Sequence, residues 1–255
     1  MGKIVLVTGA TAGIGKAVAE EFAKLSYRII ISGRREDRLN ELKNYLEGEY
    51  EVEVFVMPMD VRNKQIVEQA FINLPDAWKQ IDVLVNNAGL GLGFSPMDKG
   101  SADDWDTMID TNVKGVLYVS KQVMPGMVER KSGHIINVGS TVAKQVPKNV
   151  SIYAATKHAL NAITQGMRSE LLEHDIRVTQ VNPGYVETEF ALVSKKGNAE
   201  EAKKVYEGFK PLEPKDIADV VVYVATLPQH VNINDILVTP LAEADVFNEN
   251  RSLND

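Results

Sequence analysis

The chain has 255 residues, 44% of them hydrophobic, and carries a formal net charge of −7 without a single cysteine. The length suits one α/β domain over residues 1–255, and an acidic chain without a basic stripe is not expected to bind nucleic acid. The lack of cysteine excludes disulfides and thiolate chemistry and fits the cytoplasm, and no apolar run approaches the roughly 18 residues of a membrane span.

Seven short apolar runs alternate with longer segments of helical periodicity. The runs are Ile4–Val7, Arg28–Ser32, Val52–Met57, Asp82–Val85, His134–Val138, Arg177–Val181 and Ile236–Val238. Strands that alternate with helices indicate βαβ units and a parallel sheet, and right-handed crossovers place the helices on both faces. The sequence therefore predicts a single-domain Rossmann fold of the α/β class, with a seven-stranded parallel sheet.

A glycine-rich turn follows the first of these strands, with the sequence Gly9-Ala10-Thr11-Ala12-Gly13-Ile14-Gly15. In such a turn the first glycine permits a tight strand-to-helix connection, the second lets the backbone approach a pyrophosphate, and the third allows close helix packing. The N-terminus of the next helix then faces the phosphates. The turn predicts a dinucleotide cofactor held by residues of this segment, namely Gly9, Thr11, Gly13, Ile14 and Gly15.

The second strand is followed by Ser32-Gly33-Arg34-Arg35. A site for NAD would place an acidic residue about 20 residues beyond the glycines, where it would bind the ribose hydroxyls. Arg34 and Arg35 stand in that position, and guanidinium groups bind a phosphate through paired, charge-assisted hydrogen bonds. We therefore expect NADP(H) as the cofactor. The alternative is that both arginines are solvated surface charges.

Tyr153 and Lys157 lie four residues apart, so a helix would present both on one face. A phenol has a pKa of about 10, and proton transfer near neutral pH requires the pKa to fall by about three units. The Lys157 ammonium and a bound nicotinamide cation would lower it. Ser140 follows the strand His134–Val138, at the edge where parallel sheets bind ligands, and would hold the substrate oxygen. Tyr-x-x-x-Lys pairs also occur by chance, so the pair alone does not indicate a catalytic site. Together with Ser140 and Asn112 it predicts a catalytic set of Asn112, Ser140, Tyr153 and Lys157.

Four further segments bear on the organisation of the chain. Residues 188–213 are the least sheet-like internal stretch and form a candidate substrate lid, and residues 241–255 form a C-terminal tail. The segments Trp105–Tyr118 and Tyr153–Leu172 carry more apolar residues than one core-facing stripe needs, which indicates either plain burial or a subunit interface. The four histidines share no metal-ligand spacing, so no metal site is predicted.

From Lys3 to about Pro240 the chain resembles the short-chain dehydrogenase/reductase family. The motifs that carry the resemblance are Thr8-Gly9-Ala10-Thr11-Ala12-Gly13-Ile14-Gly15, Asp60-Val61, Asn86-Asn87-Ala88-Gly89, Asn112, Ser140, Tyr153-x-x-x-Lys157, and Asn182-Pro183-Gly184 followed by Thr188. The resemblance implies the strand order 3-2-1-4-5-6-7 and a water-linked proton route at Asn112. It further implies that the helices of Trp105–Tyr118 and Tyr153–Leu172 pair across a two-fold axis, so we expect a homodimer or homotetramer. It also implies cofactor contacts at Asp60, Val61, Asn87, Tyr153, Lys157, Pro183, Gly184, Val186 and Thr188.

Within this family, four segments resemble the NADP-dependent 3-hydroxy acid dehydrogenases. They are Leu90–Gly93, Met108–Asn112, Pro125–Arg130 and Leu227–Asn234. The resemblance implies a small 3-hydroxy acid as substrate, such as serine, allo-threonine or 3-hydroxypropionate. We expect substrate contacts from Ser140, Gln145 and Tyr153. Cations for the carboxylate would be Lys144 and Lys148, with the lid residues Lys195 and Lys196 as weaker candidates.

The sequence also allows alternative functions to be compared. A broad NADPH-dependent carbonyl reductase would use a neutral pocket lined by Phe94, Met97, Tyr185 and Phe190. A non-catalytic NADP(H)-binding regulatory protein would be expected to lack the tyrosine or the lysine, and both are present. A nucleotide-sugar epimerase or dehydratase would have a longer chain and a different glycine spacing.

Overall fold

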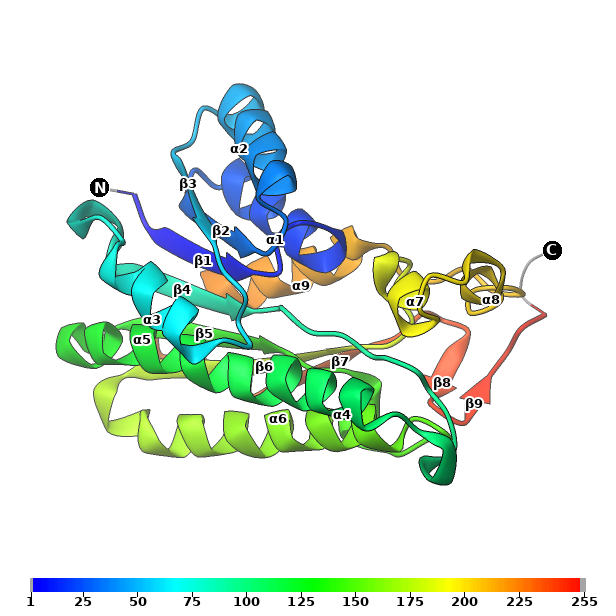
Figure 1. Cartoon of the computed structure of the whole chain (residues 1–255). Coiled ribbons are helices and arrows are strands. Elements are labelled where there is room, and N and C mark those ends of the chain that lie inside the picture. Colours follow the sequence, from blue (N-terminus) through cyan, green and yellow to red (C-terminus); the bar gives the residue numbers. More distant parts are fainter. Residues whose placement is uncertain (1, 253–255) are drawn as a thin grey trace.

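A seven-stranded parallel sheet forms the centre of the computed structural model, which describes residues 2–252 (Figure 1). The strands are β1 (Ile4–Thr8), β2 (Arg28–Gly33), β3 (Val54–Pro58), β4 (Ile81–Asn86), β5 (Gly133–Val138), β6 (Ile176–Pro183) and β7 (Asp235–Val238). Their order is β3-β2-β1-β4-β5-β6-β7, and every neighbouring pair is parallel. The predicted fold class and strand order are confirmed.

Helices cover both faces of the sheet, as Figure 1 shows. One layer contains α1 (Gly13–Lys24), α2 (Glu36–Tyr50) and α9 (Pro214–Thr226), and the other contains α3 (Lys64–Ile72), α4 (Ala102–Ile109), α5 (Gly115–Arg130) and α6 (Ser151–Glu170). Two short helices, α7 (Glu189–Ser194) and α8 (Ala199–Lys203), lie beyond the carboxyl ends of the strands. The right-handed crossovers of a parallel sheet produce this two-sided cover.

The core consists of two apolar layers, one on each side of the sheet. In β1, Val5 and Val7 pack with α1, α2 and α9, whereas Ile4 and Leu6 pack with α3, α5 and α6. All five residues of this strand are buried, which explains why its first four residues, Ile4–Val7, form a continuous apolar run instead of an alternating pattern. Burial on both faces holds the strands in place, and the candidate active site lies at their carboxyl ends.

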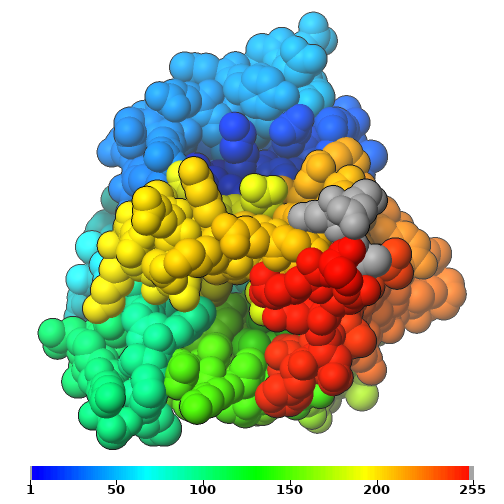
Figure 2. All heavy atoms as spheres, turned by 90° about the vertical axis from the view of Figure 1, so that its right-hand side faces the viewer, coloured from blue at the N-terminus to red at the C-terminus, as the bar shows by residue number. Residues whose placement is uncertain are grey.

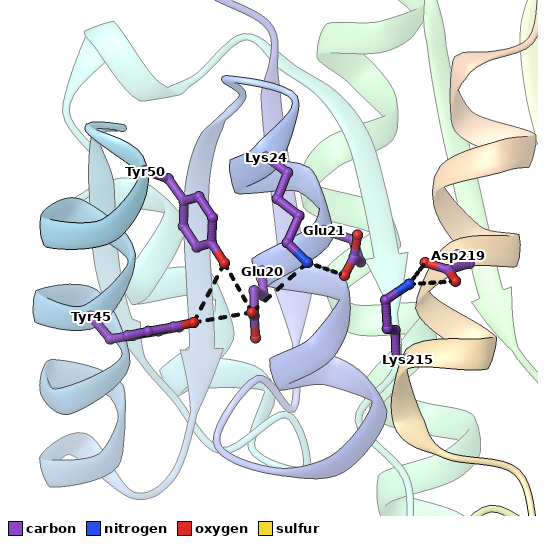
Figure 3. Close-up of polar contacts among 7 residues, drawn as sticks. All are labelled: Glu20, Glu21, Lys24, Tyr45, Tyr50, Lys215 and Asp219. Carbon is purple, nitrogen blue, oxygen red and sulfur yellow. Dashed lines mark hydrogen bonds and ion pairs between the residues drawn. The ribbon is translucent and has the colours of Figure 1, made fainter.

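Polar contacts join the outer surfaces of α1 and α2 (Figure 3). The Glu20 carboxylate accepts hydrogen bonds from the hydroxyls of Tyr45, at 3.1 Å, and Tyr50, at 2.9 Å. Lys24 pairs with Glu21 at 2.6 Å within α1. Exposed pairs of this kind contribute about 0–1 kcal/mol each. The apolar layer beneath them therefore holds these helices against the sheet.

The segment predicted as a C-terminal tail contains a β-hairpin over its described part. The hairpin pairs β8 (Glu243–Asp245) with β9 (Asn248–Glu249). Arg251, which follows it, donates hydrogen bonds to the carbonyl oxygens of Glu207, at 2.9 Å, and Lys204, at 3.4 Å. The tail is thus attached to the segment after α8. Across residues 2–252, none of the helices has the length and apolar character needed to cross a membrane.

His134 lies inside β5 with 2% of its surface exposed. Its Nε2 is hydrogen-bonded to the Thr179 hydroxyl at 2.8 Å, and its Nδ1 is buried without a partner among the described residues. Burial, aided by the charge of Arg177, lowers the pKa of His134 from 6.5 to about 3. The folded protein therefore holds this ring neutral at pH values where the unfolded chain would protonate it.

His134 should make the protein sensitive to acid. Below about pH 6.5 the unfolded chain binds a proton that the folded protein refuses, so the free energy of unfolding falls as pH falls. Between about pH 7 and about pH 4.5 this amounts to about 2–3 kcal/mol. Urea unfolding should show that His134→Gln removes this part of the pH dependence, whereas exposed His230→Gln leaves it unchanged. If the free energy of unfolding changes with pH equally in the wild type and both variants, His134 is not the source of the acid sensitivity.

Candidate active site

A cavity of about 700 Å³ lies at the carboxyl ends of the strands. Its walls come from both halves of the sheet, from the segment containing α7 and α8, and from the tail. In Figure 2 the yellow α7–α8 segment and the red tail lie side by side over this edge of the molecule, between the blue N-terminal part and the green central part. The cavity has room for a dinucleotide and a small molecule beside it.

The glycine turn has the backbone geometry that its sequence requires. Gly9 and Gly13 have φ angles of +68° and +54°. A Cβ on Gly9 would lie 2.9 Å from the Ala88 Cα, and one on Gly13 would lie 3.0 Å from the Thr188 side chain. Gly15 packs against the carbonyl of Gly9 and does not reach the cavity wall. The turn is therefore a cradle that any larger residue would fill.

The side chain of Asn87 supports this turn from the end of β4. Its Nδ2 donates to the carbonyl oxygens of Thr8, at 3.0 Å, and Gly9, at 3.2 Å. Asn87 also lies on the cavity wall, as do the predicted cofactor residues Gly9, Thr11, Gly13, Ile14, Arg34, Arg35, Asp60, Val61, Pro183, Gly184, Val186 and Thr188. The structure thus brings together these predicted cofactor residues on the wall of one cavity.

The two arginines after β2 line the far end of the cavity. The Arg35 guanidinium donates to the Thr11 hydroxyl at 2.8 Å and pairs with Glu189 at 2.9 Å. Arg38, one turn further along α2, pairs with the other oxygen of Glu189 at 2.7 Å. Glu189 is the first residue of α7, so the cationic end of the cavity is linked to the predicted lid.

The hydroxyls of Ser140 and Tyr153 are hydrogen-bonded to each other at the opposite end. Ser140 follows β5 and caps a short 3₁₀ turn, while Tyr153 lies in the first turn of α6. The Tyr153 ring packs between those of Phe94 and Phe190, at centroid distances of 5.7 and 5.5 Å. Lys157 is one turn later, 5.8 Å from the Tyr153 ring centroid, and donates to the carbonyl of Val138 at 2.9 Å.

The pKa values of this pair differ from the sequence-based expectation. Burial raises the pKa of Tyr153 to about 12, although the hydrogen bond from Ser140 opposes this effect. Burial also lowers the pKa of Lys157 to about 8. The expected lowering of the phenol pKa is therefore not a property of this pair alone, because both side chains are almost completely removed from water.

Asn112 lies in a π-helical turn, Asp110–Lys114, between α4 and α5. Its amide donates to the Leu90 carbonyl at 2.8 Å and to the Thr156 hydroxyl at 3.0 Å, and accepts from the Leu90 N–H at 2.9 Å. Asn112 is buried and does not itself line the cavity, but Gly89, beside it, does. It therefore connects α6 to the segment after β4.

The residues predicted to bind substrate separate in the structure. Ser140, Tyr153 and Lys148 lie on the cavity wall. Gln145 does not, since its Oε1 accepts a hydrogen bond from the Val246 N–H at 3.3 Å. Lys144 also lies elsewhere and pairs with Asp235 at 2.8 Å. Of the four residues in the alternative neutral pocket, Phe94, Tyr185 and Phe190 line the cavity, and Met97 does not.

Of the lysines in the candidate lid, Lys195 lines the cavity, whereas Lys196 pairs with Asp104 at 2.7 Å. Three wall residues, Glu243, Val246 and Arg251, come from the tail and were missed by the sequence analysis. No local pattern distinguishes these three residues, because they reach the cavity only through the hairpin. Within residues 2–252 there is no group of three or more His, Cys, Asp or Glu side chains that could hold a metal ion.

Comparisons with known proteins agree with this geometry. The family model described as short chain dehydrogenase matches residues 3–199. The NADP-dependent 3-hydroxy acid dehydrogenase YdfG of Salmonella typhi is 47% identical over 242 residues, which cover 94% of this chain and 96% of that protein. Serine 3-dehydrogenase of Rhizobium radiobacter is 38% identical over 244 residues, with 96% of each chain covered.

Among solved structures, the closed form of a serine dehydrogenase complexed with NADP+ is similar with a TM-score of 0.91 and 43% sequence identity. That match covers 95% of this chain and 97% of the other. The resemblance predicted from the motifs is confirmed, and the chain belongs to the short-chain dehydrogenase/reductase family.

Proposed function

We propose that the protein is an oxidoreductase that transfers a hydride between NADP(H) and the hydroxyl or carbonyl group of a small 3-hydroxy acid. The observation that carries this proposal is the hydrogen-bonded pair Ser140–Tyr153, with Lys157 one turn below it, in the same cavity as the glycine cradle and the two arginines. Its relatives include an NADP-dependent 3-hydroxy acid dehydrogenase and a serine 3-dehydrogenase. The geometry of the site and the activities of these relatives both favour hydride transfer.

The residues fit a dinucleotide phosphate. Gly9 and Gly13 leave the space that a Cβ would occupy, and the N-terminus of α1 begins at the second of them. Arg34 and Arg35 would hold the 2′-phosphate, and Thr188 and Val186 would contact the nicotinamide end. When bound, the nicotinamide supplies the acceptor or donor of the hydride.

The protein side chains would handle the proton. Ser140 would donate a hydrogen bond to the substrate oxygen, and Tyr153 would take the hydroxyl proton during oxidation and return it during reduction. Lys157 would favour the phenolate because its ammonium lies beneath the ring. Asn112 would keep the proton route open by fixing Leu90 and Thr156.

Lys148 is the proposed partner of the substrate carboxylate, and Lys195 on the candidate lid is a second one. Both lie on the cavity wall, in contrast to Lys144 and Lys196. The runner-up function is a broad NADPH-dependent carbonyl reductase, which the aromatic wall of Phe94, Tyr185 and Phe190 favours. The two functions differ in whether the substrate must be an anion.

Steady-state kinetics can distinguish them. Lys148→Ala should lower kcat/KM for serine and 3-hydroxypropionate by about 10- to 100-fold, because a hydrogen bond to a charged group contributes about 1.5–3 kcal/mol. The matched control is Lys144→Ala, which removes a nearby lysine whose partner is Asp235, and should leave kcat/KM unchanged. Methyl esters should react poorly. If esters and neutral ketones react faster than the acids, the protein is a carbonyl reductase.

We also propose that residues 188–213 form a lid. The two ends of this segment are held together, since Glu187 N–H donates to the Leu212 carbonyl at 2.8 Å and Leu212 N–H donates to the Tyr185 carbonyl at 2.9 Å. Between them, α7 and α8 stand apart from the sheet. The assembly is proposed to be a homodimer or homotetramer in the cytoplasm, and light scattering would test the assembly.

A further inference from the structure

Glu243 is a buried carboxylate on the cavity wall. It lies in β8 with 3% of its surface exposed. Its Oε2 accepts a hydrogen bond from the Tyr185 N–H at 3.0 Å, and the Thr141 hydroxyl also bonds to the carboxylate. Gly184 packs so closely on the same carboxylate that a Cβ there would collide with it. The side chain is thus fixed in one place.

No cation pairs with this carboxylate. Among residues 2–252, no lysine, arginine or histidine forms an ion pair with Glu243, although Lys148 and Arg251 line the same cavity. Arg251 pairs instead with Glu249 at 3.1 Å. Burial raises the pKa of Glu243, and the nearby Glu249 and Asp245 act in the same direction. A buried carboxylate without a cationic partner is unfavourable, so a cation brought by a ligand would stabilise it.

The position of Glu243 relates this carboxylate to the reacting group. The Thr141 hydroxyl is hydrogen-bonded to the Glu243 carboxylate, and Thr141 directly follows Ser140 in the chain. Ser140 is in turn hydrogen-bonded to Tyr153. In the proposed function the substrate hydroxyl lies between Ser140 and Tyr153. A substituent on the carbon next to the reacting carbon would therefore lie within reach of the Thr141 side of the cavity, where Glu243 is fixed.

We propose that Glu243 forms a subsite for the ammonium group of a 2-amino-3-hydroxy acid. The subsite selects hydroxy amino acids over hydroxy acids without the amino group, through a charge-assisted hydrogen bond. This inference rests on the proposed function, which places the reacting hydroxyl between Ser140 and Tyr153. It assigns the two charges of the substrate to two walls, with the carboxylate toward Lys148 and the ammonium toward Glu243.

The test compares serine with 3-hydroxypropionate, which differ only in the amino group, in the wild type and in Glu243→Gln. Glutamine keeps an oxygen that can accept from Tyr185 N–H, so the hairpin retains its attachment. We expect the ratio of kcat/KM for serine over that for 3-hydroxypropionate to fall by about 10- to 100-fold. The control is Glu249→Gln, an exposed carboxylate of the same hairpin, which should leave the ratio unchanged.

Calorimetry gives a second readout that does not require turnover. In protein loaded with NADP+ and carrying Tyr153→Phe, serine should bind more tightly than 3-hydroxypropionate, and Glu243→Gln should remove this preference. If Glu243→Gln weakens the binding of both compounds equally, Glu243 only holds the tail in place, and this result overturns the subsite. If neither compound binds or reacts, the proposed function fails. If both react and the ratio is unaffected by Glu243→Gln, the proposed function stands and the subsite does not.

Discussion

Replacing Tyr153 by phenylalanine should lower kcat by about 10²- to 10⁴-fold, the usual contribution of a general acid or base. The ring keeps its packing against Phe94 and Phe190, so the loss reports the hydroxyl alone. Because oxidation requires the deprotonated phenol, the wild-type rate should rise with pH, and the variant should lack this rise. Stopped-flow absorbance of NADPH measures both effects.

The control for this variant is its cofactor affinity. Tyr153→Phe should bind NADP+ with a Kd close to that of the wild type and should unfold at a similar temperature, since neither property depends on the proton. Turnover close to that of the wild type would show that another group moves the proton. In that case Ser140, which shares the hydrogen bond with Tyr153, would be the next residue to replace.

The double replacement of Arg34 and Arg35 by alanine should raise the KM for NADPH by about 10²- to 10⁴-fold and change the KM for NADH by less than about threefold. Each guanidinium that bonds to a phosphate contributes about 1.5–3 kcal/mol, and NADH has no 2′-phosphate to lose. The wild type should accordingly prefer NADPH. Competition by 2′,5′-ADP, compared with 5′-AMP, measures the phosphate contribution without the nicotinamide.

Arg38→Ala is the matched control for the double variant. Arg38 pairs with Glu189 at 2.7 Å, as Arg35 does at 2.9 Å, but it does not line the cavity. Its loss removes a nearby positive charge and a contact to α7 without removing a phosphate ligand. Equal use of both cofactors by the wild type, or an equal effect of Arg38→Ala, would show that the arginines are surface charges.

The sequence predicted the parts of the molecule that follow from local physics. Strand positions follow from apolar runs buried on two faces, and the glycine turn follows from the positive φ angles of Gly9 and Gly13. Tyr153 and Lys157 are one helical turn apart, so their common face could be deduced as well. These features depend on neighbours in the chain and on repeating hydrogen bonds.

Other features depend on contacts between distant residues, which the sequence did not indicate. Lys144 pairs with Asp235, 91 residues away, and Gln145 bonds to Val246, 101 residues away. Both side chains are thereby directed away from the cavity wall. Glu243 likewise reaches Tyr185 only because the tail forms a hairpin. The pKa of Tyr153 also could not be predicted, because it depends on how completely α6 and its neighbours exclude water.

The π-helical turn at Asp110–Lys114 has a consequence for changes in chain length. Such a turn contains one residue more than the α-helix around it needs, and removing one residue would join α4 and α5 into a regular helix with better hydrogen bonding. Each residue in an α-helix rotates the next by about 100°, so the deletion would turn Asn112 away from Leu90 and Thr156. A more regular helix would thus separate α6 from the segment after β4.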